Sequence, residues 1–312
     1  MKVAVLGAGA MGSLFGGMLA QRGHHVWLLD IWKEHVETIG KRGLRITGLS
    51  GDRVIKSVKA ASSAQEVGSV DLVIVFVKST VTEEAVRSAS SLFGPETLAL
   101  TLQNGIGNVE QIARVIGSRN VLAGTTAQGA TVLGPGEIYH AGQGPTAIGE
   151  LMGAVTPRVK NVAAIFNDAG IQTSVSDNVM GLIWGKLLVN LGINALTALT
   201  GLRNGQLLDH PETVEILELA VLEGFRVCKA KGISLPYEDP VAHTKEVAMA
   251  TSSNISSMLQ DVKNRRKTEI EMINGAVVRE AQAMGIETPV NKVLTNLVRV
   301  LERSYIHGSQ KP

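Results

Sequence analysis

Residues 2–30 of the chain read KVAVLGAGAMGSLFGGMLAQRGHHVWLLD. The apolar run Lys2–Leu6 predicts a buried strand, residues 10–22 predict a helix, and residues 26–29 predict a second strand. Between the first strand and the helix, residues 7–12 form the pattern G-x-G-x-x-G. A strand, a glycine-rich turn, a helix and a second strand in this order are typical of the first unit of a doubly wound α/β domain.

Short apolar runs continue to alternate with helical segments as far as about residue 175. These runs are continuously apolar, which indicates strands covered on both faces, and the helices between them indicate a mainly parallel sheet. Glycines and prolines at 134–145 predict a hairpin that ends this domain. The other expected elements are helices at 33–41, 81–90, 109–115 and 157–169 and strands at 72–77, 97–101, 121–124 and 171–175.

Strand patterns stop near residue 177, and long helical segments follow. Their expected ends carry typical residues, such as Pro240 at one start and Gly232 at one end. We therefore predict two domains, a Rossmann α/β domain over residues 1–176 and an all-α domain over residues 177–312. The helices of the second domain are expected at 178–200, 212–231, 240–250, 256–284 and 289–303.

Composition restricts the function classes. The formal net charge of +2 is too small to indicate nucleic acid or an anionic membrane as the main partner, and the basic run at 263–267 is expected to be a solvated helix face. We find no apolar run of about 20 residues that would predict a membrane span. The only cysteine, Cys228, cannot form an internal disulfide. These features indicate a cytoplasmic protein with a small-molecule ligand, and we expect no metal site.

The glycine pattern predicts a binding site for a dinucleotide. Gly7 allows a tight turn, Gly9 lets the backbone approach a pyrophosphate, and Gly12 allows close packing of helix on strand. The helix N-terminus supplies partial positive charge for the anion. The pattern alone is a weak signal, but its place between a strand and a helix strengthens it. The residues expected to contact the cofactor are Gly7, Ala8, Gly9, Ala10, Met11 and Gly12.

Three further residues follow strands of the predicted sheet at its carboxyl edge. Asp30 is placed to bind a ribose 2′-hydroxyl, which favours NADH over NADPH, although Lys33 is near enough to leave the choice of cofactor open. Lys78 could reach a phosphate or ribose, and Asn104 could bridge cofactor and substrate. The alternatives are a capping or solvated aspartate, a solvated loop lysine and an asparagine turn.

Residues 182–199, LIWGKLLVNLGINALTAL, carry a polar stripe in an otherwise apolar helix. Steps of four residues place Lys186, Asn190 and Asn194 on one face, and burial of these groups is unfavourable unless they have partners. A lysine can protonate the alkoxide formed when a ketone is reduced, and amides can hold a neighbouring carboxylate. We expect burial to lower the pKa of Lys186 and a nearby carboxylate to oppose this shift.

The fourth long helix expected in the second half carries further candidates. Asn254 and Ser257 lie at its start, as substrate-side groups or simply as caps. Glu269 would lie about 18 Å further along the axis, nearer the lysine or the cofactor. Asp261 and Arg265 are expected to form an i,i+4 salt bridge on the same helix.

Five segments of the chain carry family-specific patterns. They are VLGAGAMGSLFGGMLAQRGHHVWLLD (5–30), LQNGIGNVE (102–110), GPGEIYHAG (134–142), WGKLLVNLGINALTALTGLRNG (184–205) and NISSMLQDVKNRRKTEIEMINGAVV (254–278). Together these segments resemble the ketopantoate reductase (2-dehydropantoate 2-reductase) family. The resemblance covers nearly the whole chain, and its helical segments are more specific than the glycine pattern. It implies a Rossmann domain, a helical domain, an active site in the cleft between them, and reduction of ketopantoate to pantoate on the way to coenzyme A.

The resemblance also implies residue roles. Lys186 matches the general acid, and Glu269 matches a glutamate that assists near the cofactor and the lysine. Asn104 matches an asparagine shared by cofactor and substrate, Lys78 a lysine on the phosphate or ribose side, and Ala130 a backbone contact to the cofactor. The matches to substrate-binding residues are Asn190, Asn194, Asn204, Asn254 and Ser257.

One departure from the family keeps alternatives open. Most relatives carry an arginine after the second strand, suited to the 2′-phosphate of NADPH, where this chain has Asp30, Ile31 and Trp32. A related group of NADH-dependent D-2-hydroxyacid dehydrogenases, acting on other branched 2-ketoacids, is therefore the second interpretation, and a non-catalytic dinucleotide sensor is the third. Asn254 beside Ser257 favours ketopantoate, whose 4-hydroxyl needs a polar partner. We expect a homodimer, while feedback by coenzyme A stays undecided.

Overall fold

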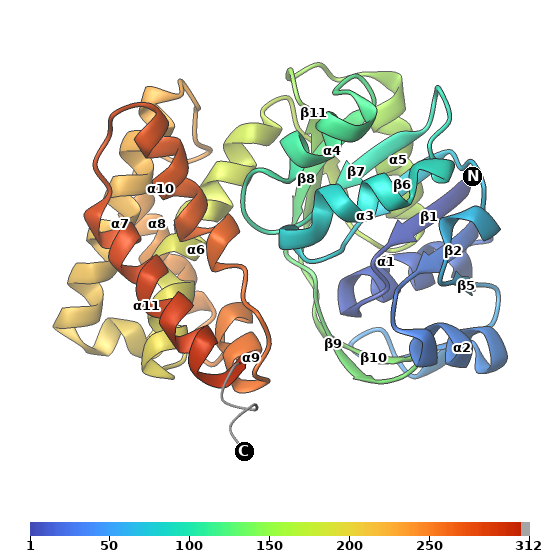
Figure 1. Ribbon diagram of the computed structural model, residues 1–312, viewed down its shortest axis with the longest axis horizontal. Coiled ribbons are helices and arrows are strands. Elements are labelled where there is room, and N and C mark those ends of the chain that lie inside the picture. Colours follow the sequence, from blue (N-terminus) through green and yellow to red (C-terminus); the bar gives the residue numbers. More distant parts are fainter. Residues whose placement is uncertain (307–312) are drawn as a thin grey trace. The chain divides into compact units, whose positions relative to one another are not determined.

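The computed structural model describes residues 1–306, and the chain divides into two compact units (Figure 1). The first unit comprises Met1–Gln103 and Asn108–Met180. The second comprises Asn104–Gly107 and the chain from Gly181 onward. The short segment Asn104–Gly107 follows a strand of the first unit in sequence, but its contacts are with the helical unit.

An eight-stranded sheet forms the centre of the first unit, in the order β12-β11-β8-β7-β6-β1-β2-β5 (Figure 1). All neighbouring strands are parallel except the pair β8 and β11, so the prediction of a mainly parallel sheet is confirmed. The chain moves outward from β1 first on one side and then on the other, which is the doubly wound arrangement. The strands are β1 (Lys2–Leu6), β2 (His25–Leu29), β5 (Lys59–Ala61), β6 (Leu72–Val75), β7 (Leu98–Thr101), β8 (Val121–Thr126), β11 (Thr146–Glu150) and β12 (Thr173–Val175).

Both faces of this sheet are covered because its central strands carry apolar residues on both sides. Val3 and Val5 of β1 join a cluster with residues of α1 (Ala10–Gln21) and α5 (Pro157–Asp168). Ala4 and Leu6, which point the other way, join a cluster with residues of α3 (Thr82–Ser88) and α4 (Asn108–Ile116). The remaining helix of this unit is α2 (Lys33–Arg42), and 3₁₀ turns occur at Ala64–Glu66, Ser79–Val81 and Ser90–Leu92.

A second, four-stranded sheet was not predicted. Its order is β4-β3-β10-β9, and the hairpin expected at 134–145 is its β9–β10 pair, which begins earlier. The missed strands are short, and Gly17 of α1 lets the helix pack closely on them, since a Cβ there would lie 2.9 Å from side-chain atoms of Leu44 and Ile46. The strands are β3 (Leu44–Gly48), β4 (Arg53–Ile55), β9 (Gly129–Gly134) and β10 (Glu137–Gly142).

The second unit is helical throughout its described residues, as predicted. Its longest helix, α6, has the length and composition of a membrane span, contrary to our expectation, but 72% of its most apolar window is buried in the protein. Gly224 allows α7 to pack tightly on it, because a Cβ there would lie 2.5 Å from a methyl carbon of Leu191. The helices are α6 (Val179–Thr200), α7 (Pro211–Ala230), α8 (Pro240–Ala250), α9 (Ser257–Lys263), α10 (Asn274–Ala283) and α11 (Pro289–Ile306), with 3₁₀ turns η4 (Gly205–Asp209) and η5 (Ile270–Met272).

The single helix predicted at 256–284 is wrong, because the chain forms α9, η5 and α10 there. Helix α9 ends at Lys263 with Asn264 as its C-cap, and Arg265 follows with a φ of +51°. The backbone N–H of Thr268 donates to the Glu302 carboxylate instead of to a helical carbonyl, which stabilises the break. Asp261 and Arg265 therefore do not share a continuous helix, and Glu269 does not lie further along the axis of α9.

Candidate active site

The glycine loop joins the carboxyl ends of three neighbouring strands. The N–H groups of Gly7 and Ala8 donate to the carbonyl of Leu29, at the end of β2, over 2.9 and 3.1 Å. Gly7 has a φ of +97°, and a Cβ there would lie 2.6 Å from the backbone nitrogen of Val77, just beyond β6. The loop thus lies where the order of the strands reverses, which is the usual ligand-binding position of such sheets.

The other two glycines of the motif have different environments. A Cβ on Gly12 would lie 2.0 Å from the Gly7 carbonyl oxygen, so this position permits only glycine without a backbone shift. A Cβ on the exposed Gly9 would have no protein atom within 4 Å. Gly9 is also the N-cap of α1 and has no side chain that could cap that end, so the amides of Ala10 and Met11 can serve an outside anion. These residues fit the pyrophosphate of a dinucleotide.

A buried chain of hydrogen bonds from His35 through Ser13 to Ala8 supports the glycine loop, and sequence analysis missed it. His35, in α2, accepts at Nδ1 from the N–H of Gly136 at 3.0 Å, which leaves its Nε2–H facing Ser13 Oγ at 3.4 Å. Ser13 Oγ donates to the carbonyl of Ala8 at 2.8 Å. Burial lowers the pKa of His35, against the effect of the Asp30 carboxylate, so the neutral ring is favoured. The sequence feature that could have indicated this relay is a histidine on the apolar face of the mostly charged helix α2.

A cavity of about 530 Å³ opens beside the glycine loop, lined by Gly7, Asp30, Gln65 and Glu84 among others. Asp30 is fixed in the lining of this cavity by two hydrogen bonds. Its N–H donates to the carbonyl of Ala61, and its carboxylate accepts from the N–H of Trp32 at 3.0 Å. Within the described chain, the lining contains two carboxylates and neither lysine nor arginine. Either carboxylate could accept a hydrogen bond from a ribose hydroxyl.

The remaining cofactor-side candidates belong to three different segments of the chain. Lys78 is exposed and lies three residues beyond the last residue of β6, after its carboxyl end. Asn104 begins the segment that packs on the helical unit, where the N–H of Ile106 donates to the carbonyl of Met272 at 3.1 Å. Asn104 is thereby placed near the turn that carries Glu269. Ala130 lies on β9 of the smaller sheet, opposite His140.

The predicted polar stripe is present on α6. Lys186 and Asn190 are partly buried, and Asn194 is buried. Near its C-terminus, α6 is hydrogen-bonded to the N-cap of α9, because Thr197 Oγ1 and Ser256 Oγ are 2.7 Å apart. Three polar groups on successive turns of one helix thus project from an apolar framework, spaced by about 6 Å along the axis.

Lys186 is the chemically distinctive member of this stripe. Burial lowers its pKa from 10.5 to about 8, and the negative charge of Glu269 opposes the shift. Glu269 lies in the turn between α9 and η5 and is partly buried. The structure therefore brings these two groups into electrostatic contact, although they are far apart in sequence. An ammonium with a pKa near neutrality can donate a proton in catalysis.

The other substrate-side candidates meet at the loops of the helical unit. The N–H of Asn204 donates to the carbonyl of Asn254 at 3.0 Å, and Asn204 Nδ2 donates to Thr251 Oγ1 at 2.9 Å. Asn204 Oδ1 is buried without a protein partner, while Asn254 is exposed. The cap of α9 is Ser256, whose Oγ accepts from the N–H of Leu259. Ser257, which is exposed at the first helical position, is therefore not the cap.

A dinucleotide fold joined to a helical unit with a lysine of lowered pKa defines a nicotinamide-dependent oxidoreductase. Two family models match the chain, the ketopantoate reductase PanE/ApbA model over residues 3–153 and the model of its C-terminal part over residues 178–302. The chain belongs to the ketopantoate reductase family.

Similar proteins extend over the whole chain. The 2-dehydropantoate 2-reductase of Halobacterium salinarum is 41% identical over 97% of this chain and 99% of its own length. A PanE/ApbA family ketopantoate reductase from Ralstonia eutropha has a TM-score of 0.91 with 37% identity, covering 98% of this chain and 100% of that one. D-mandelate dehydrogenase with NADH and anilino(oxo)acetate has a TM-score of 0.92 with 32% identity, covering 98% and 99%.

Proposed function

We propose that this protein is a 2-dehydropantoate 2-reductase, which reduces the C2 ketone of ketopantoate to the alcohol of pantoate. When bound, the nicotinamide supplies the hydride. The observation that carries the proposal is the α6 stripe, in which Lys186 has a pKa lowered to about 8. A relative with this activity in its name is 41% identical over 97% of the chain.

The chain's own residues would bind, orient and protonate the substrate. The Lys186 ammonium would donate a hydrogen bond to the ketone oxygen and then give its proton to that oxygen as the alkoxide forms. Asn190 and Asn194 would hold the carboxylate and hydroxyl groups through their amides, which do not titrate. Glu269 would keep Lys186 protonated by opposing the effect of burial. One hydride and one proton convert the ketone to the alcohol.

The first test is a comparison of substrates. Initial rates with purified protein should show ketopantoate turnover at least tenfold above that of 2-ketoisovalerate and 2-ketoisocaproate, because only ketopantoate offers a 4-hydroxyl to Asn204, Asn254 or Ser257. Each ketoacid is assayed with NADH and NADPH in parallel. Inert ketopantoate together with rapid reduction of a plain branched ketoacid would exclude the proposed substrate.

A specific observation supports one alternative. The similar D-mandelate dehydrogenase structure contains NADH, and the cavity beside Asp30 has a carboxylate-bearing lining. An NADH-dependent D-2-hydroxyacid dehydrogenase acting on another branched 2-ketoacid is therefore the second candidate. A dinucleotide-binding sensor without turnover is disfavoured, because it would not need the proton donor Lys186.

We further propose that the cofactor is NADH rather than NADPH. The kcat/KM with NADH is expected to exceed that with NADPH at least tenfold, because a 2′-phosphate would lie against the Asp30 carboxylate. Asp30→Ala should reduce this ratio by about tenfold or more, since a hydrogen bond to a charged group contributes about 1.5–3 kcal/mol. The control is Glu84→Ala, which removes another carboxylate from the same cavity. Equal ratios in wild type and Asp30→Ala would contradict the assignment.

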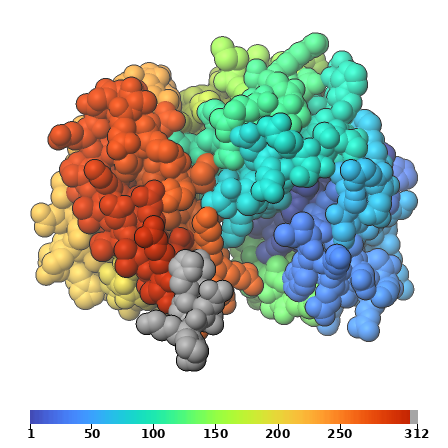
Figure 2. All heavy atoms as spheres, in the orientation of Figure 1, coloured from blue at the N-terminus to red at the C-terminus, as the bar shows by residue number. Residues whose placement is uncertain are grey.

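We propose a cytoplasmic homodimer with no nucleic-acid or membrane partner. The support for a dimer is an apolar row on α11, where Val293, Leu297 and Val300 are 56%, 49% and 62% exposed. These positions follow the i, i+4, i+7 spacing of one helical face. The helix lies on the face of the second unit shown in Figure 2, where its atoms are red.

A further inference from the structure

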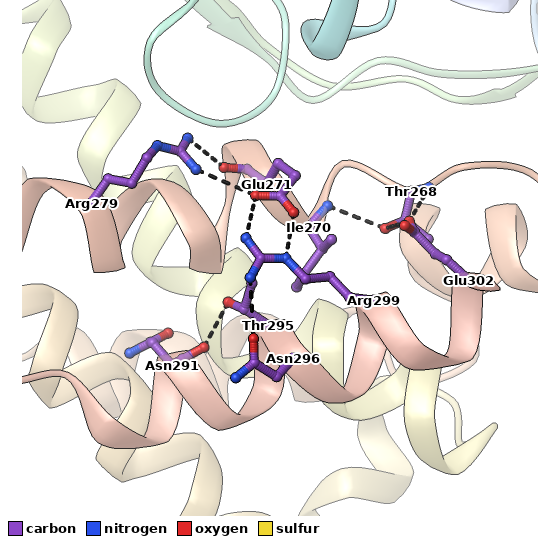
Figure 3. A network of polar contacts seen from close by, with 9 residues as sticks. All are labelled: Thr268, Ile270, Glu271, Arg279, Asn291, Thr295, Asn296, Arg299 and Glu302. Atoms are coloured by element: carbon purple, nitrogen blue, oxygen red, sulfur yellow. Dashed lines mark hydrogen bonds and ion pairs between the residues drawn. The ribbon is translucent and has the colours of Figure 1, made fainter. Parts of the chain in front are cut away.

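The turn that carries Glu269 is held on its N-terminal side by one buried carboxylate. Glu302 Oε1 accepts from both the N–H and the Oγ1–H of Thr268, at 2.6 and 2.5 Å (Figure 3). Thr268 is 1% exposed and Glu302 8% exposed, so water does not compete for these bonds. Thr268 Oγ1 also accepts from the N–H of Ile270 at 3.2 Å. The residues on both sides of Glu269 are thus connected to Glu302.

The Glu302 bonds form one clamp on the turn, and a second clamp acts on the C-terminal side of Glu269. Arg299 donates from Nε and Nη2 to the two carboxylate oxygens of Glu271, at 2.6 and 2.8 Å (Figure 3). Arg279 donates from Nη2 to the backbone carbonyl of Glu271 at 2.7 Å. The Arg299 guanidinium lowers the pKa of Glu271, as expected for a two-point ion pair.

Both clamps originate from one face of α11, one turn apart. That helix is itself anchored at its start, because the N–H groups of Val290 and Asn291 donate to the buried Glu223 carboxylate, each at 2.9 Å. The helix is therefore a fixed support against which the short stretch Thr268–Glu271 is held. A turn of irregular backbone would otherwise have several accessible conformations.

We infer that Glu302, assisted by Arg299, is a positioning residue that holds the Glu269 carboxylate toward Lys186. The inference rests on the proposed function, in which Lys186 is the proton donor and Glu269 keeps it protonated. Neither Glu302 nor Arg299 needs to touch the substrate or the cofactor for this role.

The sign of the expected effect follows from the charges around the turn. Glu269 raises the pKa of Lys186 against the lowering by burial. Glu269 is the charged group that acts on the pKa of Lys186, whereas Arg299, Arg279 and Lys267 lower the pKa of the Glu271 carboxylate. If the Glu302 clamp is removed and Glu269 moves away, the pKa of Lys186 falls further. The pH above which reduction is lost should then move to lower values.

The test compares Glu302→Ala with Glu302→Gln by the pH profile of kcat/KM for ketone reduction. Alanine removes the acceptor of both Thr268 donors, and the basic limb should move down by roughly half a unit or more. Glutamine keeps an Oε1 acceptor, so its limb should stay at the wild-type position. An exposed carboxylate of the same unit, Glu287, supplies the control Glu287→Ala. Superimposed limbs for Glu302→Ala and wild type would overturn the inference.

A second pair of variants covers the case in which Glu302→Ala does not fold. Thr268→Val removes both bonds of the hydroxyl, the one donated to Glu302 and the one accepted from the N–H of Ile270, but leaves the backbone bond to Glu302. Thr268→Ser keeps both hydroxyl bonds, so the basic limb should move in Thr268→Val and not in Thr268→Ser. Failure of the proposed function has a separate signature, which is full turnover in Lys186→Ala. Loss of turnover in Lys186→Ala, together with an unmoved limb in Glu302→Ala and Thr268→Val, would overturn the inference alone.

Discussion

Lys186→Ala is expected to lower kcat/KM for ketone reduction by about 10³-fold, within the range of about 10²–10⁴ typical of a lost general acid. Dinucleotide binding should persist, because the glycine loop and its cavity belong to the other unit. Steady-state rates and titration of NADH against the variant measure the two quantities separately. Activity equal to that of the wild type would remove Lys186 from the mechanism.

The same lysine sets the expected pH dependence of the wild-type enzyme. The protonated ammonium is the active form, so kcat/KM should be constant below its pKa, which is about 8, and fall tenfold per unit above it. The matched control is Lys292→Ala, which removes an exposed lysine from the same unit and should change neither rate nor profile. A basic limb at the ordinary lysine value would show that burial does not act on the group during catalysis.

The parts of the fold that the sequence predicted well are those with one dominant local signal. β1 coincides with its predicted bounds, and α8 begins at Pro240 and ends at Ala250, as expected. The strands β3, β4 and β5 were missed because each has three to five residues with exposed or partly exposed positions. Their stability comes from pairing with other strands and from packing on helices, α1 for β3 and β4 and α2 for β5, which a local pattern does not contain.

The break between α9 and η5 was missed for a similar reason. The chain there has no glycine or proline, and its helix is interrupted by a bond from Thr268 to Glu302, which is distant in sequence. On the candidate site, the spacing of Lys186, Asn190 and Asn194 was sufficient to place them on one face. By contrast, the partnership of Lys186 with Glu269 came from the family resemblance, because no periodicity links two residues on different elements.

Gly9→Ala and Gly12→Ala are expected to separate ligand binding from folding. A methyl group at Gly12 would lie 2.0 Å from the Gly7 carbonyl oxygen, so this variant should lose about 1–3 kcal/mol of stability and several degrees of Tm. At Gly9 a methyl group would meet no protein atom within 4 Å, and the residue has an ordinary φ of −62°. The unliganded Gly9→Ala protein should therefore melt like the wild type.

The affinity for the dinucleotide should fall in Gly9→Ala, although the stability of this variant is unchanged. The pyrophosphate of the cofactor is expected against the backbone at Gly9, so Gly9→Ala should raise the Kd for NADH at least tenfold, which is about 1.4 kcal/mol. Calorimetric titration of NADH, with thermal melts of the unliganded proteins, measures both effects. An unchanged Kd in Gly9→Ala would mean that the open side of this glycine faces solvent in the complex as well, and the loop would then be a structural turn rather than a pyrophosphate site.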